Sequence, residues 1–178
     1  MNKENLNCWY AIRTFNCMEM EISEFLRKKN LINFVPMTYA EKFEKNEVKP
    51  KRIFVPVIHN YIFLQKTKPE KEICKILNKC QLPLSVIKKE STCNFYEITE
   101  QEMNEFRLLC DPQFDNSVFM ERDEAEAKPG KDVIIIHGPF EGIKGKLYRK
   151  DDNFYFIKTL VGIGVMVRIS RWYCKVLK

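Results

Sequence analysis

Residues 8–15 read CWYAIRTF, a stretch rich in aromatic and β-branched side chains, as is typical of a β-strand. Directly behind it, Asn16 stands three residues before Glu19, which is the spacing of a helix capping box. Apolar residues then recur at helical intervals up to a cationic end at residues 27–29; they are Met18, Ile22, Phe25 and Leu26. The sequence therefore predicts a strand that leads into an amphipathic helix.

The same mixture of strands and helices continues to residue 110. A second helix is expected to begin near Pro69, and a third behind Thr99, which has Glu102 at capping-box spacing. The expected strands are residues 31–43, 52–65, 82–88 and 94–98, the first two being joined by the charged segment 44–51. This pattern predicts an α+β fold, an antiparallel sheet flanked by helices, over residues 7–110.

An acidic segment follows at residues 111–127, with 6 acidic and 1 basic side chain. It mostly lacks either apolar period, and residues 118–120 are its only apolar run. We interpret it as a linker between two domains, although an acidic surface loop or short helix within one domain is the alternative.

The last part, residues 128–178, has no helical period and carries 11 basic against 4 acidic side chains, a net charge of +7. Short strands are expected at residues 133–136, 146–149, 154–158, 165–169 and 173–176, separated by turn residues. Five strands in so short a segment predict a small β-barrel, because closure removes the exposed edges of the sheet.

Composition limits the classes of protein to be considered. With 45% hydrophobic and 30% charged residues in 178, the chain can bury a core, and its net charge of +6 permits a polyanionic partner. No apolar run is long enough to span a membrane, and residues 1–7 do not begin a signal peptide. Seven cysteines without a CxxC pair fit a reducing cytosol, most of them as small core residues, so we expect a soluble cytoplasmic protein.

The residues that most enzymes use are scarce. The two histidines, His59 and His137, lie in apolar, strand-like stretches, where packed or hydrogen-bonded roles are more common than catalytic ones. Cys74 and Cys80 have no histidine nearby to complete a zinc site, and no cysteine stands beside a histidine in the sequence. The glycine-rich segment 138–146 fits no phosphate-binding motif and is expected to form a tight turn. We therefore expect no catalysis, cofactor or metal.

Two separated signatures make the chain resemble the NusG-type transcription elongation factors. The first comprises Trp9-Tyr10, Glu19, residues 34–36 and residues 56–63, and is similar to the N-terminal domain of that family. The second, in residues 129–145, is similar to its KOW motif, with Gly138, Pro139, Phe140, Gly142 and Gly145. The resemblance implies a polymerase-binding domain at residues 7–110 and an SH3-like, five-stranded KOW barrel at residues 128–178.

The resemblance also implies a function. The N-terminal domain of the family packs on the clamp helices of RNA polymerase close to upstream DNA and suppresses pausing or termination. Residues 56–61 are similar to the segment that marks specialised, RfaH-like paralogues serving surface or capsular polysaccharide operons, because Asn60 replaces a glycine; His59 departs from that pattern. A monomer is expected. A ribosomal protein or a termination factor is the implied partner of the KOW domain, with Phe140 and Ile163 as its contacts.

Carried over by resemblance, the polymerase contacts fall on Arg13, Ile58 and Tyr61, with Trp9 and Phe15 supporting or joining them. An aromatic patch with an arginine suits an interface, but the same apolar residues could form core beneath a helix.

Two nucleic-acid surfaces are also considered. Lys49, Lys51 and Arg52, near the tip of the expected hairpin, could touch phosphates of upstream DNA or nascent RNA. The alternative function is an RNA-binding or ribosome-associated module whose working part is the basic, aromatic-rich C-terminal barrel.

Overall fold

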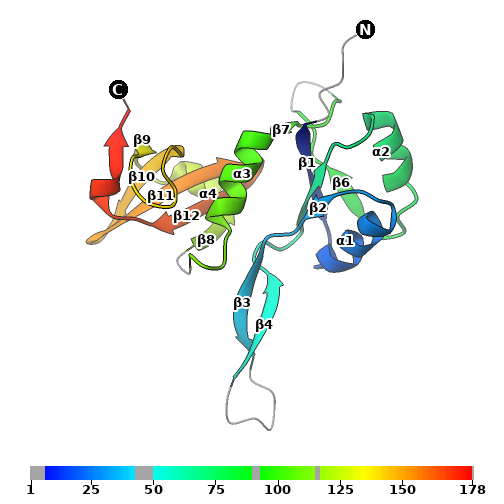
Figure 1. Ribbon diagram of the computed structural model, residues 1–178, viewed down its shortest axis with the longest axis horizontal. Helices are drawn as coiled ribbons and strands as arrows, with labels where there is room; N and C mark the ends of the chain where they lie inside the picture. Colours follow the sequence, from blue (N-terminus) through cyan, green and yellow to red (C-terminus); the bar gives the residue numbers. More distant parts are fainter. Residues whose placement is uncertain (1–6, 43–49, 90–92, 115–116, 178) are drawn as a thin grey trace. The chain divides into compact units, whose positions relative to one another are not determined.

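The computed structural model describes residues 7–42, 50–89, 93–114 and 117–177 (Figure 1). The chain divides into two compact units, the first ending at Met103 and the second beginning at Asn104. Both mix strands with few helices, so the expected α+β class is confirmed. Within the described residues, no helix combines the length and the apolar character needed to cross a bilayer.

The sheet of the first unit is built around β1 (Cys8–Thr14), the strand expected from CWYAIRTF. On one side β1 pairs antiparallel with β5 (Tyr61–Gln65), which in turn pairs with β2 (Asn33–Phe34). On the other side it pairs with β6 (Leu84–Val86) and with β7 (Ile98–Thr99). Every one of these pairings is antiparallel, as predicted.

Two helices cover one face of this sheet, namely α1 (Glu19–Lys28) and α2 (Glu70–Leu77) (Figure 1). Successive residues of a strand point to opposite faces, so Tyr10 and Ile12 of β1 share the face that the helices cover. Their core partners include Ile22, Leu26, Ile62, Leu64, Ile73 and Leu77. The opposite face of β1 therefore carries Trp9, Ala11 and Arg13.

The two long strands expected at residues 31–43 and 52–65 are each interrupted. Beyond β2, the chain enters β3 (Met37–Lys42), which pairs with β4 (Lys51–Pro56) as a separate two-stranded ribbon. Figure 1 shows this ribbon leading away from the sheet. Pro36 directly precedes β3, and Pro56 is the last residue of β4, opposite Met37. Proline has no N–H to donate, so neither position can supply a full set of ladder hydrogen bonds.

The two expected capping boxes have opposite outcomes. Helix α3 (Glu100–Leu109) is preceded by the predicted box, in which Glu102 N–H donates to Thr99 Oγ1 at 3.2 Å and Thr99 N–H donates to Glu102 Oε2 at 2.9 Å. The box predicted for α1 does not form, because Asn16 has a positive φ of 56° and α1 begins at Glu19 with no side-chain cap.

The second unit contains one antiparallel sheet of six strands in the order β13-β9-β10-β11-β12-β8. The five strands expected from the sequence are present as β9 (Lys131–Ile135), β10 (Lys144–Lys150), β11 (Asn153–Leu160), β12 (Ile163–Arg168) and β13 (Cys174–Val176). The turn η1 (Arg171–Tyr173) precedes β13. The expected closed five-stranded barrel is not found: in the described residues, the end strands β13 and β8 do not pair with each other.

The expected linker at residues 111–127 is largely part of this second unit. Its apolar run Val118-Phe119-Met120 lies in β8 (Ser117–Glu121), which pairs with β12 and supplies the sixth strand. The acidic residues that follow form α4 (Arg122–Ala127), which buries Ala125 and contacts β11 and β12. The described acidic side chains of α4, those of Asp123, Glu124 and Glu126, are exposed.

Candidate functional site

The pairing of β1 with β5 places Arg13 directly opposite Tyr61. Opposite residues in an antiparallel pair project to the same face, and this is the face that α1 and α2 leave uncovered. Arg13 is exposed and Tyr61 is half-buried, while Phe15, just after β1, keeps 43% of its surface exposed. We call Arg13, Phe15 and Tyr61 the Tyr61 surface. It combines an arginine with aromatic rings, the composition favoured at protein interfaces.

Two residues expected to join this surface are instead buried. Trp9 is only 1% exposed, and its indole Nε1 donates a hydrogen bond of 2.6 Å to Glu100 Oε2 at the start of α3. Ile58 is 8% exposed, contrary to the expectation that it faces a partner. The contact on Ile58 was carried over by resemblance to a segment expected to be a strand, but residues 57–60 form a bend and a turn, and Ile58 faces the interior.

Asn60 fixes the turn that presents Tyr61. Its φ is 66°, in the left-handed region that glycine and asparagine adopt more readily than other residues. Its carbonyl accepts from Thr14 N–H at 2.9 Å, its side-chain Oδ1 accepts from Cys17 N–H at 3.2 Å, and its own N–H donates to the buried Glu19 carboxylate. The turn before β5 is thus fastened to the turn after β1.

The ribbon of β3 and β4 carries a second candidate surface. Lys51 and Arg52 are exposed on β4, and the Arg52 guanidinium lies 4.3 Å from the centre of the Tyr39 ring. Tyr39 also contacts Phe54, with 5.0 Å between ring centroids, and about half of each aromatic side chain is exposed. We call Tyr39, Arg52 and Phe54 the ribbon platform. Lys49, also expected to touch nucleic acid, lies outside the described residues.

Tyr39 and Phe54 were not expected from the sequence to be functional residues. The available signal was that each aromatic residue stands in an expected strand close to charged residues. Only the register, in which Tyr39 is opposite Phe54, shows that the two rings meet.

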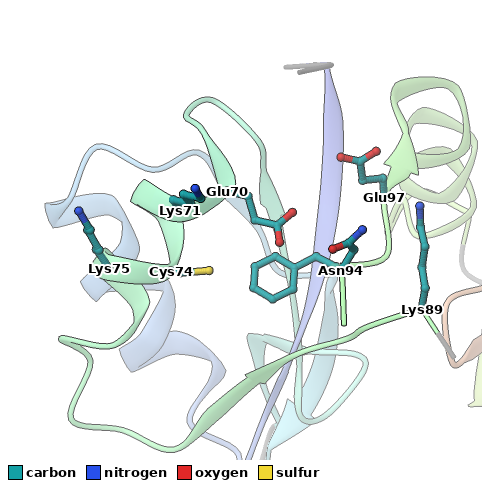
Figure 2. Close-up of a pocket in the computed structure, with 8 residues that line it drawn as sticks. Glu70, Lys71, Cys74, Lys75, Lys89, Asn94 and Glu97 are labelled. Carbon is teal, nitrogen blue, oxygen red and sulfur yellow. The ribbon is translucent and has the colours of Figure 1, made fainter. Parts of the chain in front are cut away.

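A hollow of about 610 Å³ lies beside α2 and was also not expected. Figure 2 shows Glu70 and Cys74 projecting from α2 toward the segment that carries Asn94 and Glu97. Three lysines and two glutamates surround the hollow, so its rim has mixed charge; the lysines are Lys71, Lys75 and Lys89.

A buried lysine, Lys66, forms an ion pair with Glu97 at the rim of this hollow. Lys66 Nζ lies 2.8 Å from Glu97 Oε1, and the hydrogen bond from Lys66 holds the pKa of Glu97 below its ordinary value. Burial alone would lower the pKa of Lys66, but its hydrogen bond to Glu97 and the nearby Tyr10 outweigh this and raise it. Burial, together with the charge of Glu97, raises the pKa of the Cys8 thiol to about 11. Because reactivity requires the thiolate, Cys8 is an inert core thiol at neutral pH.

The KOW-like residues of the second unit form the expected tight turn. Gly138 and Gly142 have φ values of 89° and 88°. Gly145 is closely packed, because a Cβ atom there would lie 2.4 Å from the Ile157 carbonyl oxygen. Pro139 is exposed, but Phe140 is buried against Phe114, with 4.9 Å between ring centroids.

The expected partner contacts of the second unit lie in its interior. Both Phe140 and Ile163 are buried, so their assignment as exposed contacts is wrong. Among the described residues of this unit, Trp172 in η1 is the most exposed of the large apolar side chains, with 85% of its surface accessible to solvent.

Comparison with known proteins gives one family. Residues 7–107 match the family model described as "Transcription termination factor nusG". The comparison with curated proteins gives no match. The matched segment includes the whole sheet of the first unit, the Tyr61 surface and the ribbon platform.

Proposed function

Since the chain belongs to the NusG family of transcription elongation and termination factors, we propose that it binds the clamp helices of RNA polymerase through the Tyr61 surface and suppresses pausing or termination. Members of this family typically bind RNA polymerase. The observation that carries the proposal is the pairing of exposed Arg13 with Tyr61 on the sheet face opposite the helices. The proposal gives the protein no catalytic step.

The rigidity of the Tyr61 surface supports this assignment. Both turns that border it are joined through Asn60, so the backbone that carries the aromatic side chains is held in place before a partner arrives. A preformed surface loses less conformational entropy on binding than a mobile one. We also assign the protein to the operon-specific, RfaH-like branch serving surface polysaccharide genes, supported by the left-handed Asn60 in the similar segment.

A double substitution tests the docking surface. We expect Phe15→Ala with Tyr61→Ala to weaken binding of the full chain to immobilised core RNA polymerase at least tenfold, about 1.4 kcal/mol. The matched control is Met20→Ala with Ile32→Ala, since both residues are exposed apolar side chains outside the Tyr61 surface. Circular dichroism checks that both variants fold. Equal retention of the two variants by polymerase would contradict the docking assignment.

We propose that the ribbon platform contacts a strand of upstream DNA or nascent RNA. Two exposed rings and a guanidinium suit the stacking of unpaired bases, and Lys51 adds attraction to phosphates. The proposal needs no base-specific contact, because stacking tolerates any base.

A second candidate function is RNA binding by the second unit. The observation that favours it is the exposed Trp172, which lies beside Arg171 and near Lys175 in the basic C-terminal part. The same exposed tryptophan suits a ribosomal protein or a termination factor as partner.

Fluorescence anisotropy with labelled single-stranded RNA and DNA distinguishes these two surfaces. We expect Tyr39→Ala with Phe54→Ala to reduce the affinity of the full chain at least tenfold, because stacking contributes about 1–3 kcal/mol per base. Trp172→Ala should leave the affinity within twofold, and affinity should fall steeply as salt is raised. The reverse result, in which only Trp172→Ala loses affinity, would favour the second candidate.

A further inference from the structure

Three metal-ligating side chains from distant parts of the sequence converge at the turns that border the Tyr61 surface. Cys17 lies in the turn after β1, Glu19 is the first residue of α1, and His59 lies in the turn before β5. One ligand atom from each of them, the Cys17 sulfur, a Glu19 carboxylate oxygen and a His59 ring nitrogen, lies within 4.8 Å of the other two. We propose that Cys17, Glu19 and His59 bind a divalent metal ion of the zinc class.

The kinds of ligand select the class of metal. A thiolate, an imidazole and a carboxylate are the three side-chain types that Zn²⁺ takes, whereas Ca²⁺ and Mg²⁺ require oxygen ligands. Three protein ligands leave a fourth position of a tetrahedral site open to water or to a group from a partner.

The site has one fixed ligand and two adjustable ones. Glu19 is 1% exposed, and its carboxylate accepts the backbone N–H of Asn60, which holds it in one orientation. Cys17 and His59 are exposed, so their side chains can rotate without disturbing the core. His59 Nδ1 lies 4.0 Å from Glu19 Oε1. Ligand atoms around tetrahedral zinc are about 3.3–3.8 Å apart, so closing the site requires movements of about 1 Å.

The backbone brings the ligands together without the metal. The Cys17 N–H donates to Asn60 Oδ1 at 3.2 Å, and Cys17 and Asn60 both hold positive φ values, of 56° and 66°. The cluster was invisible in the sequence, because His59 is 42 residues beyond Cys17 and was expected to be packed in a strand. A bound ion would join the turn that follows Phe15 to the turn that precedes Tyr61.

Metal titration of the full chain tests the site. After removal of metals with a chelator in a thiol-free reductant, we expect one equivalent of Zn²⁺ to bind in competition with a chromogenic chelator. Co²⁺ at the same site should show sulfur-to-metal charge transfer. Cys17→Ser and His59→Gln should each weaken Zn²⁺ binding about 100-fold or more. Loss of a residue that only hydrogen-bonds to a metal ligand already lowers metal affinity about 10–100-fold, and loss of the ligand itself should cost at least as much.

The chain supplies matched controls, because Cys93 and His137 are also exposed. Cys93→Ser and His137→Gln should retain one equivalent of Zn²⁺ with unchanged affinity. Zn²⁺ should also protect Cys17, and not Cys93, from alkylation, as read by mass spectrometry of peptides. Absence of stoichiometric binding, or binding that survives in both Cys17→Ser and His59→Gln, would overturn the site. Metal binding by the purified chain does not depend on the polymerase proposal, so either can fail without the other.

Discussion

Replacing Trp9 by alanine should lower the free energy of unfolding of the first unit by about 4 kcal/mol, because removal of a buried aromatic side chain leaves a large cavity. Trp9 is 1% exposed on the central strand, and its indole donates to Glu100 at 2.6 Å. Thermal unfolding of the full chain, followed by circular dichroism, measures the loss. The result decides whether Trp9 supports the Tyr61 surface from within or contacts a partner directly.

The second tryptophan provides the matched control. Trp172 is 85% exposed, so Trp172→Ala should change stability by less than about 0.5 kcal/mol. Trp9→Phe keeps a ring in the core but removes the indole donor, so we expect an intermediate cost of roughly 1–2 kcal/mol. Equal stability of Trp9→Ala and Trp172→Ala would show that Trp9 does not belong to the core.

The local elements were largely predictable from the sequence. The aromatic and β-branched run at residues 8–15 became β1, and Thr99 with Glu102 formed the expected capping box. These predictions depend on a few adjacent residues, whose preferences are local. The prediction for Asn16 failed because Glu19, which a capping box would turn back toward its own helix, instead binds the N–H of Asn60, 41 residues away.

The errors arose where distant segments meet. Ile58 was assigned to the polymerase contact by resemblance, but it lies in the bend and turn between β4 and β5 and is buried. Likewise, acidic composition suggested a linker at residues 111–127, while pairing with β12 made part of it a strand. Charged residues that face the solvent dominate the composition of such a segment, whereas a short apolar run is enough to form an edge strand.

The candidate sites depend even more on register. The family resemblance assigned Arg13 and Tyr61 to one patch, and only the register of β1 with β5 shows that they lie directly opposite each other. Neither the ribbon platform nor the cluster of Cys17, Glu19 and His59 has a spacing motif, because each combines residues from two segments. The sequence pattern predicts where strands lie but not which residues of two strands stand opposite each other, and these sites depend on that register.

Buried Lys66 depends on its ion pair with the partly exposed Glu97. Glu97→Ala should lower the free energy of unfolding by about 2 kcal/mol, because it leaves a buried ammonium without its carboxylate. The Lys66 side chain is 5% exposed and that of Glu97 is 36% exposed, so screening by water reduces the effect below that of a fully buried pair. Lys66→Met should lower the free energy of unfolding by less than about 1 kcal/mol, since water can hydrate the partly exposed Glu97 carboxylate that is left without a partner.

The dependence of stability on pH provides an independent test of the Lys66–Glu97 ion pair. Lys66 lowers the pKa of Glu97 in the folded protein, so the stabilisation is complete above the unfolded pKa of about 4.3 and is lost as pH falls through the folded value. Urea unfolding between neutral pH and about pH 3 should therefore show this loss in the wild type, and Glu97→Gln should lack it.

An exposed ion pair in the same unit serves as control. Lys68 and Glu72 are one helical turn apart, with 2.5 Å between Lys68 Nζ and Glu72 Oε1, and both side chains are about a third or more exposed. Glu72→Ala should cost less than about 0.5 kcal/mol, because pairs in water contribute little. If Glu97→Ala costs no more than Glu72→Ala, or less than Lys66→Met, then the buried Lys66 ammonium is not stabilised by Glu97.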